Sequence, residues 1–334
     1  MSSGKTPIFM LGATGYLGSQ VLQRLLAHPS ASTFEITALV RSPEKATLLD
    51  SQFGVKAVVG HHGELEKLER LASEAHVVFS IASSDDVPAM QAIVAGLRKR
   101  QATLGDLPIL IHTVSVLTDD ARGMYATDLI YSDMNVEQVE SLPPTAWHRN
   151  VDLEVVGADQ QGLASGPLVE AGIANPHSIQ IPYLIKASLA RKRAGIVGAG
   201  KAVWADVHVD DVADLYIVLY DAIATDPDAV GHGREGYYFA ENGEHTWMDL
   251  GKAIGRALVE VGVSESDEPT TFEREELIKY FGSEAFGNAV SGTNSRCRAD
   301  RGRSIGWKPK YTTADMLASI KPEVEIFLNK SQSA

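Results

Sequence analysis

Three glycines spaced three residues apart follow the first apolar segment, and they constrain the fold of this chain more than any other feature. Residues 7–11 predict a buried strand, Gly12, Gly15 and Gly18 come next, and apolar residues at helical spacing over 21–26 predict a helix. In such a turn the first glycine permits the bend, the second lets a pyrophosphate approach, and the third lets helix and strand pack closely. The context favours a dinucleotide-binding turn over a glycine turn with no ligand.

Apolar segments that do not alternate with polar residues recur along the next hundred positions, with helical patterns between most of them. They predict strands over 34–40, 55–59, 77–82 and 109–114. Strands of this kind are typical of a parallel sheet that is covered by helices on both faces. The fold class we predict is therefore α/β, with a doubly wound Rossmann domain over about residues 1–160.

The later part of the chain has a different pattern, with helices separated by longer connections that contain Gly and Pro. We expect a smaller α+β substrate lobe over about 161–330, with some late segments returning to the Rossmann domain. Predicted here are strands over 203–209 and 236–240, a helix over 210–223, and a helix over 247–261 that Thr246 opens and Gly262 ends.

Composition excludes several classes of protein. The 334 residues are 44% hydrophobic and 22% charged, as in a globular domain, and the single cysteine, Cys297, has no partner for an internal disulfide. The formal net charge of -13 argues against nucleic acid as a partner. Because residues 1–7 lack a signal pattern and no apolar run is long enough to span a bilayer, we expect a cytoplasmic protein with no membrane partner.

The end of the second predicted strand bears on the choice of cofactor. An acidic residue at this place accepts bonds from the ribose hydroxyls of NAD, but the chain has Arg41, followed by Ser42 and then Lys45. A guanidinium here can pair with a 2′-phosphate, so NADP(H) is the predicted cofactor. A solvated charge at a strand end is the alternative interpretation of Arg41.

Several motifs together resemble the extended short-chain dehydrogenase/reductase superfamily, and more closely its atypical members that are epimerase/dehydratase-like. The resemblance spans most of the chain. The motifs that carry it are the glycine turn, residues 37–42, Ala82-Ser83, 111–115 (Ile-His-Thr-Val-Ser), 207–213 (Val-His-Val-Asp-Asp-Val-Ala) and 306–309 (Gly-Trp-Lys-Pro).

The resemblance implies a set of cofactor-binding and catalytic positions. Ala82 and Ser83 are expected beneath the cofactor, and Ser115 at the place where the family's catalytic hydroxyl polarises a substrate carbonyl. A local hydroxyl at a strand end is an equally good interpretation of Ser115. The full predicted cofactor site comprises Gly12, Thr14, Gly15, Tyr16, Leu17, Gly18, Arg41, Ser42, Lys45, Ala82, Ser83 and Thr113.

The chain departs from the family where the proton donor is expected. The family uses a Tyr followed four positions later by a Lys, which a helix presents on one face. The helix expected over 147–156 has His148 and Asp152 at that spacing instead. An imidazole can donate a proton near neutral pH and a carboxylate can fix its tautomer, but a capping or solvated pair is the alternative. Tyr131 is the rival donor.

A second departure concerns the sixth strand of the family. Residues 160–177 contain no convincing apolar strand. Either this strand is shortened in the chain, or residues 153–156 supply it and the helix expected there is wrong. The choice affects the geometry near the nicotinamide.

These patterns lead to one predicted function and its alternatives. We expect NADP(H)-dependent oxidation or reduction of a small-molecule carbonyl or alcohol, with Ser115, Tyr131, His148 and Asp152 as candidate catalytic residues. The alternatives are a non-redox regulator that binds NADP(H), and a biosynthetic isomerase or cyclase that keeps the cofactor as a bound helper. No metal site is predicted, because the histidines at 61, 62 and 232 lack ligand spacing. A homodimer is left open.

Overall fold

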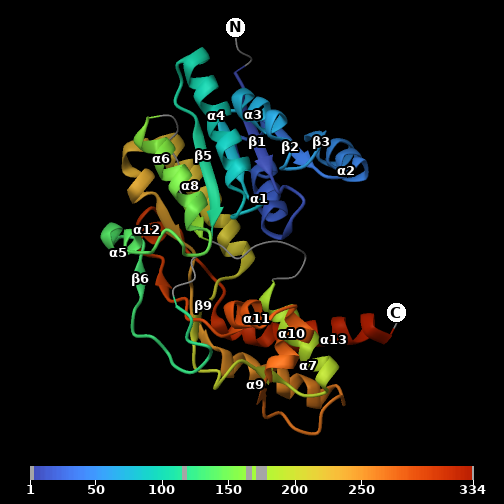
Figure 1. Ribbon diagram of the computed structural model, residues 1–334. Helices are drawn as coiled ribbons and strands as arrows, with labels where there is room; N and C mark the ends of the chain where they lie inside the picture. The colour runs from blue at the N-terminus through green and yellow to red at the C-terminus, as the bar shows by residue number, and fades with distance from the viewer. Residues whose placement is uncertain (1–3, 115–118, 163–167, 171–178, 333–334) are drawn as a thin grey trace.

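A seven-stranded parallel sheet organises the computed structural model, which describes residues 4–114, 119–162, 168–170 and 179–332. The strand order is β10-β7-β5-β4-β1-β2-β3, with the first strand near the middle, as in a doubly wound fold (Figure 1). All its neighbouring strands run parallel. The strands are β1 (Thr6–Leu11), β2 (Phe34–Val40), β3 (Lys56–Val59), β4 (Val77–Ser80), β5 (Ile109–Val114), β7 (Leu168–Glu170) and β10 (Tyr237–Phe239).

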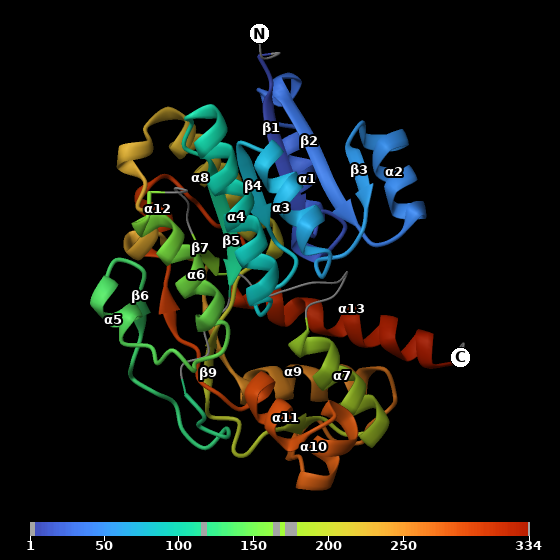
Figure 2. The ribbon, with the colours of Figure 1, turned by 45° about the horizontal axis from the view of Figure 1, so that its top comes forward.

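The five strands predicted in the N-terminal half are confirmed, with differences of one or two residues at their ends. Two groups of helices cover the sheet on opposite faces (Figure 2). One group packs α1 against α8, and the other places α4 between α3 and α6, while α2 lies beside β3. Their bounds are α1 (Tyr16–Leu26), α2 (Pro43–Phe53), α3 (Leu65–Glu74), α4 (Val87–Leu104), α6 (Arg149–Gln160) and α8 (Val209–Thr225).

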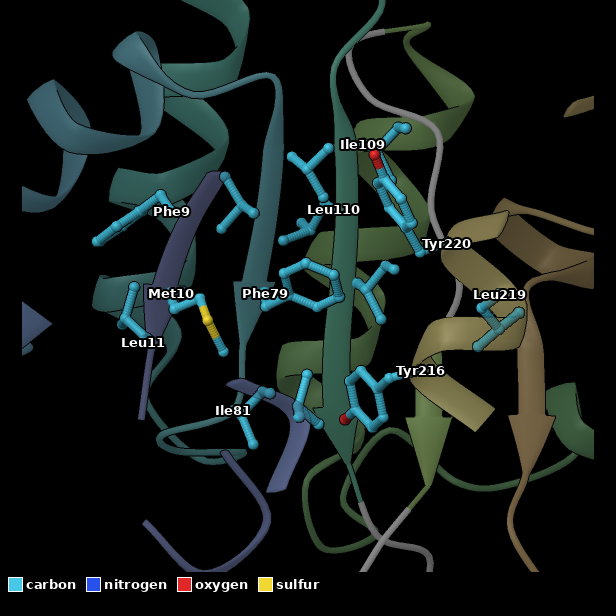
Figure 3. Close-up of a cluster of buried hydrophobic side chains, with 14 of the residues drawn as sticks. Phe9, Met10, Leu11, Phe79, Ile81, Ile109, Leu110, Tyr216, Leu219 and Tyr220 are labelled. Atoms are coloured by element: carbon cyan, nitrogen blue, oxygen red, sulfur yellow. The ribbon is translucent and has the colours of Figure 1, made fainter. Parts of the chain in front are cut away.

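The core of the nucleotide-binding half lies between this sheet and its helices. Met10 and Phe79 are fully buried on the central strands, and Tyr216 of α8 packs beside them (Figure 3). The rings of Phe79 and Tyr216 have centroids 6.2 Å apart. Both faces of these central strands are buried. Their sequences are therefore continuously apolar and do not alternate between apolar and polar residues.

The second lobe has an apolar core of its own, built mainly by helices of the later chain. Thr246 opens α9 with a capping box, as predicted, and α13 packs on both α7 and α9. The elements of this lobe are α7 (Gln180–Arg191), β8 (Gly195–Ile196), β9 (Val203–Ala205), β11 (Glu244–Thr246), α9 (Trp247–Glu260), β12 (Thr270–Thr271), α10 (Arg274–Phe281), α11 (Glu284–Ser291) and α13 (Thr313–Gln332).

Short elements complete the fold. β6 pairs with β13, so that a segment before α6 lies beside one near the end of the chain. The remaining elements are the 3₁₀ turns η1 (Ala31–Thr33), η2 (Pro227–Ala229) and η3 (Gly233–Glu235), with β6 (Tyr131–Ser132), α5 (Val136–Glu140), β13 (Cys297–Arg298) and α12 (Asp300–Ser304). None of the described helices has the length and apolar character that crossing a bilayer requires.

The structure decides between the two interpretations of the sixth strand. Residues 149–160 form the helix α6, so a strand over 153–156 is wrong. The sixth strand is present in shortened form as β7, three residues long, between β5 and β10. Three residues are too few to produce a recognisable hydrophobic period.

One predicted strand is too long. The segment 203–209 holds only three strand residues in β9, and α8 already begins at Val209. His208 ends the extended segment because its Nδ1 accepts the Asp210 backbone N–H at 3.2 Å and so caps α8.

The two late motifs dock against each other. The buried Trp307 donates its indole N–H to the Asp211 carbonyl at 2.7 Å. The Asp211 carboxylate in turn accepts the backbone N–H groups of Lys310 and Tyr311, both at 2.9 Å. These bonds hold the chain after Trp307 against the start of α8.

Candidate active site

The glycine turn has the backbone geometry that a dinucleotide-binding turn requires. Gly12 has φ +85°, a conformation that side-chain-bearing residues rarely adopt, and the Gly15 N–H donates to the Gly12 carbonyl at 2.8 Å. A Cβ on Gly18 would lie 2.1 Å from the Gly12 carbonyl oxygen, so close packing of helix and strand depends on that glycine. Gly12 and Gly18 therefore have the structural roles predicted for them.

Gly15 differs from the other two glycines. It has φ -84°, and a Cβ there would meet only the Gly12 carbonyl oxygen, at 3.2 Å. The protein itself therefore constrains this position only weakly. No side chain of the described residues caps α1, and its first turn has no acidic residue, so its N-terminal N–H groups can accept an anion as a ligand. Thr14 lies half-buried within the same turn.

The cationic side chains predicted to bind the 2′-phosphate follow β2, the neighbour of β1 in the sheet. Arg41 and Lys45 are exposed, and no ion pair joins Arg41 to another described residue. Ser42 caps α2, because its Oγ accepts the Lys45 backbone N–H at 3.3 Å. The Arg41 guanidinium is thus available at the same sheet edge as the glycine turn.

A cavity of about 480 Å³ lies between the two lobes, next to the N-terminus of α1. Tyr16 and Leu17 of α1 line it together with Ala82 and Ser83, which follow β4. These four of the predicted cofactor residues are therefore brought together. The opposite wall comes from the second lobe and includes Trp204, Asp206, His245, Trp247, Phe286 and Val290.

His148 faces this cavity from the nucleotide-binding half. It stands before α6 rather than within it, in a left-handed conformation with φ 68°. Its Nδ1 lies 2.5 Å from Asp85 Oδ1 and 3.1 Å from Ser84 Oγ. Because a carboxylate only accepts, Nδ1 carries the proton and Nε2 is the nitrogen left for a ligand. An uncommon backbone conformation at such a place is consistent with a functional constraint.

The predicted pairing of His148 with Asp152 is wrong in its geometry. Asp152 is buried away from the cavity, with Oδ2 3.9 Å from the Arg149 guanidinium. Burial raises the pKa of Asp152 to about 7, although the nearby Arg149 acts in the opposite direction. The four-residue spacing places two residues on one face only if both are helical, and His148 is not. The carboxylate that holds His148 is Asp85.

The other candidate catalytic and cofactor residues lie elsewhere. Tyr131 is buried in β6, outside the residues that line the cavity. Thr113 is also buried, and its hydroxyl is hydrogen-bonded to the hydroxyl of Tyr216. Ser115 lies outside the described residues. Of the four predicted catalytic residues, His148 is the one that the described structure brings to the cavity.

Sequence reasoning missed a second polar pair in the cavity. His245 Nδ1 lies 3.1 Å from Asp206 Oδ2, and both side chains are almost buried. These residues are far apart in the chain and no motif joins them. Asp85 had a weaker signal that could have been read, since it closes the polar run Ser83-Ser84-Asp85 directly after a buried strand.

Comparisons with known proteins bear on the glycine turn and on the fold. Residues 12–104 match the family model described as NAD(P)H-binding. Oxidase ucsJ from Acremonium sp is 30% identical over 330 residues, which cover 90% of this chain and 92% of the relative.

Two solved structures share the fold at low sequence identity. Triphenylmethane reductase from Citrobacter sp., complexed with NADP(H), is 18% identical with a TM-score of 0.62, covering 94% of this chain and 99% of that one. The DesIV double mutant, a dTDP-glucose 4,6-dehydratase from Streptomyces venezuelae with NAD and DAU bound, is 14% identical with a TM-score of 0.65, covering 95% and 96%.

The family model and the glycine turn identify an NAD(P)H-binding domain on a Rossmann-type sheet. The chain belongs to the same family as oxidase ucsJ, and it shares its fold with epimerase/dehydratase-like proteins. The predicted fold class and the resemblance to epimerase/dehydratase-like proteins are thereby confirmed, and oxidase ucsJ is a relative that matches along nearly its whole length.

Proposed function

We propose that the chain is an NADP(H)-dependent oxidoreductase that reduces a small carbonyl compound, or oxidises the corresponding alcohol, in the cavity between its lobes. The observation that carries the proposal is the position of His148. A histidine held through Nδ1 by Asp85 faces the same cavity as the open N-terminus of α1. This arrangement supports His148 as a proton donor beside the proposed cofactor site, in a chain that lacks the family's Tyr and Lys pair.

The residues of this half fit a dinucleotide. The uncapped N–H groups of α1 would hold its phosphates, and the weakly constrained Gly15 leaves room for their approach. Arg41 would pair with a 2′-phosphate, which supports NADP(H) over NAD(H). Ala82 and Ser83 would form the floor below the cofactor. When bound, the reduced cofactor supplies the hydride that the carbonyl carbon accepts.

The chain's own contribution to reduction is the proton. His148 would donate it from Nε2 to the carbonyl oxygen as the C–O double bond becomes a single bond. The Asp85 carboxylate accepts the Nδ1–H, so it fixes the orientation of the ring. In the direction of oxidation the neutral ring accepts the proton of the alcohol at the same nitrogen.

Consumption of NADPH with neutral ketones and aldehydes tests the proposal. The absorbance of NADPH should fall when a substrate is added to the unmodified protein and should stay constant with Gly15→Val, which serves as the control without bound cofactor. Binding of NADPH without consumption by any carbonyl compound would favour the regulator or the isomerase and cyclase alternatives. Absence of NADPH binding would reject all of these functions.

A further inference from the structure

The wall of the cavity that the second lobe supplies is aromatic and apolar. Trp204 of β9 and Trp247 of α9 have ring centroids 5.5 Å apart. Both indole N–H groups donate to the Thr293 carbonyl, at 2.7 and 3.3 Å. With their N–H groups already bonded, the two rings offer a ligand apolar surface only. Phe286, Val290 and Leu250 extend this surface.

The charges around the cavity have one sign. Among the described residues that line it, the charged ones are Asp85 and Asp206, and there is no lysine or arginine. The nearby Arg296 lies outside that set, with its guanidinium bonded to the Glu244 carboxylate at 2.7 and 2.9 Å. An anionic substrate group would therefore lose its hydration without gaining a cationic partner.

A polar pair, Asp206 and His245, interrupts the apolar wall. β9 and β11 form an antiparallel pair in which Trp204 lies opposite His245, so the strand pairing places His245 next to Asp206. The Asp206 carboxylate also accepts the Thr313 hydroxyl at 3.1 Å, which fixes it against α13. With its Nδ1 directed to Asp206, His245 is left with Nε2 for a ligand.

We propose that this half of the cavity binds an uncharged, apolar ring compound and orients it through one hydrogen bond between its polar group and His245 Nε2. The inference rests on the proposed function, because it describes the substrate class of the same cavity. The aromatic wall would take the ring by stacking and burial, and Asp206 is a positioning residue that holds the imidazole. Nucleotide sugars are disfavoured, because the described residues that line the cavity include no lysine or arginine for a second diphosphate.

A matched pair of probes tests the substrate class by calorimetry, with and without NADPH. 2-Acetylnaphthalene and 2-naphthoate share one ring system and differ in charge. The ketone should bind at least about 10-fold more tightly than the carboxylate, and UDP-glucose should not bind detectably. Equal or tighter binding of 2-naphthoate or UDP-glucose would overturn the proposal, and so would failure of the ketone to bind.

Variants of the polar pair test the orienting bond. His245→Phe should weaken binding of 2-acetylnaphthalene about 5- to 10-fold, the usual contribution of one hydrogen bond. The matched control is His28→Phe, which removes another histidine held by an aspartate, with His28 Nε2 2.9 Å from Asp221 Oδ1, outside the cavity. That control should bind as the unmodified protein does.

The two proposals can fail separately. NADPH affinity should be unchanged in His245→Phe, because its binding groups lie in the other half. If His245→Phe binds the ketone as tightly as the unmodified protein does, the orienting role is wrong while the cofactor proposal stands. If NADPH does not bind, the cofactor proposal is wrong while the probe series without cofactor still decides the substrate class.

Discussion

The two halves of the cavity differ in how the chain builds them. The nucleotide half depends on residues 12–18, a contiguous turn, together with the few residues that follow β4. The substrate half draws on β9, β11, α9 and α11, which meet only in the folded protein. A cofactor of constant structure can be held by local backbone geometry, whereas a substrate site is defined by side chains from several segments. The first kind of site is therefore readable in the sequence and the second is not.

The largest expected effect concerns the contiguous turn. Gly15→Val should weaken NADPH binding by about 100-fold or more, because the side chain would occupy the space where the pyrophosphate approaches α1. The fold should survive, since the position is crowded only by one carbonyl oxygen at 3.2 Å. Thermal unfolding with and without NADPH measures both properties.

A suitable control is Gly157→Val in α6, where a Cβ would meet no atom within 4 Å. This variant should still gain stability from NADPH. If Gly15→Val gains as much stability as the control does, the turn is not the phosphate site, and the contrast between the two halves loses its basis.

The next effect tests which residue acts at the boundary of the halves. His148→Phe should lower turnover about 10²- to 10⁴-fold, the usual contribution of a general acid, with NADPH affinity nearly unchanged. Asp85→Asn should lower turnover by a smaller factor, because the ring keeps a polar neighbour but loses the carboxylate that accepts its Nδ1–H and fixes its orientation. Initial rates at saturating NADPH provide the measurement.

Asp152→Asn serves as the control for the pairing that the sequence suggested. Since Asp152 does not line the cavity, this variant should keep the turnover of the unmodified protein. A loss of turnover larger than that of Asp85→Asn would contradict the assignment of Asp85 as the partner of His148. Full activity of His148→Phe would favour Tyr131 and Ser115 as the proton donors.

A smaller effect concerns the choice between the two nicotinamide cofactors. The unmodified protein should bind NADPH about 10- to 100-fold more tightly than NADH, the range of a charge-assisted hydrogen bond to the 2′-phosphate. Arg41→Asp should abolish or reverse this preference and leave the binding of NADH in place. Calorimetric titrations of both cofactors decide it, and equal affinities in the unmodified protein would refute the role of Arg41.

The smallest effect is on stability and comes from Asp152. Its pKa in the folded protein is about 7, above the ordinary value of 3.8, because burial disfavours the charged form. The folded protein therefore holds this proton more tightly than the unfolded chain does. The resulting stability is fully present below about pH 4 and is lost as the pH rises through about 7.

Asp152→Asn removes this titration, so the variant should gain stability relative to the unmodified protein between about pH 5 and about pH 8. The melting temperature of the variant, minus that of the unmodified protein, should be a few degrees higher at about pH 8 than at about pH 5. Thermal unfolding of both proteins at the two pH values measures it. If the two melting temperatures differ by the same amount at both pH values, Asp152 is already ionised in the folded protein at the lower pH.

How much of the fold could be predicted depends on how local its causes are. The strands over 34–40 and 109–114 were predicted at their observed bounds because each is a continuous apolar run with clear breaks. A shortened sixth strand was one of two alternatives, but the sequence did not locate β7, because three residues carry no period and its place is set by pairing with β5 on one side and β10 on the other. The helix N-cap at Thr246 was predictable because its capping bonds join neighbouring residues.

The sequence alone determined the nucleotide half, because Gly12, Gly15 and Gly18 act through the backbone of their own turn. Only the tertiary structure decided the partner of His148. A left-handed residue before α6 turns its ring toward Asp85, 63 positions earlier in the chain, and Asp152 is left in the interior. Spacing along a chain identifies neighbours only within a regular helix or strand. Across a loop or between lobes, the packing of the whole molecule selects which side chains meet.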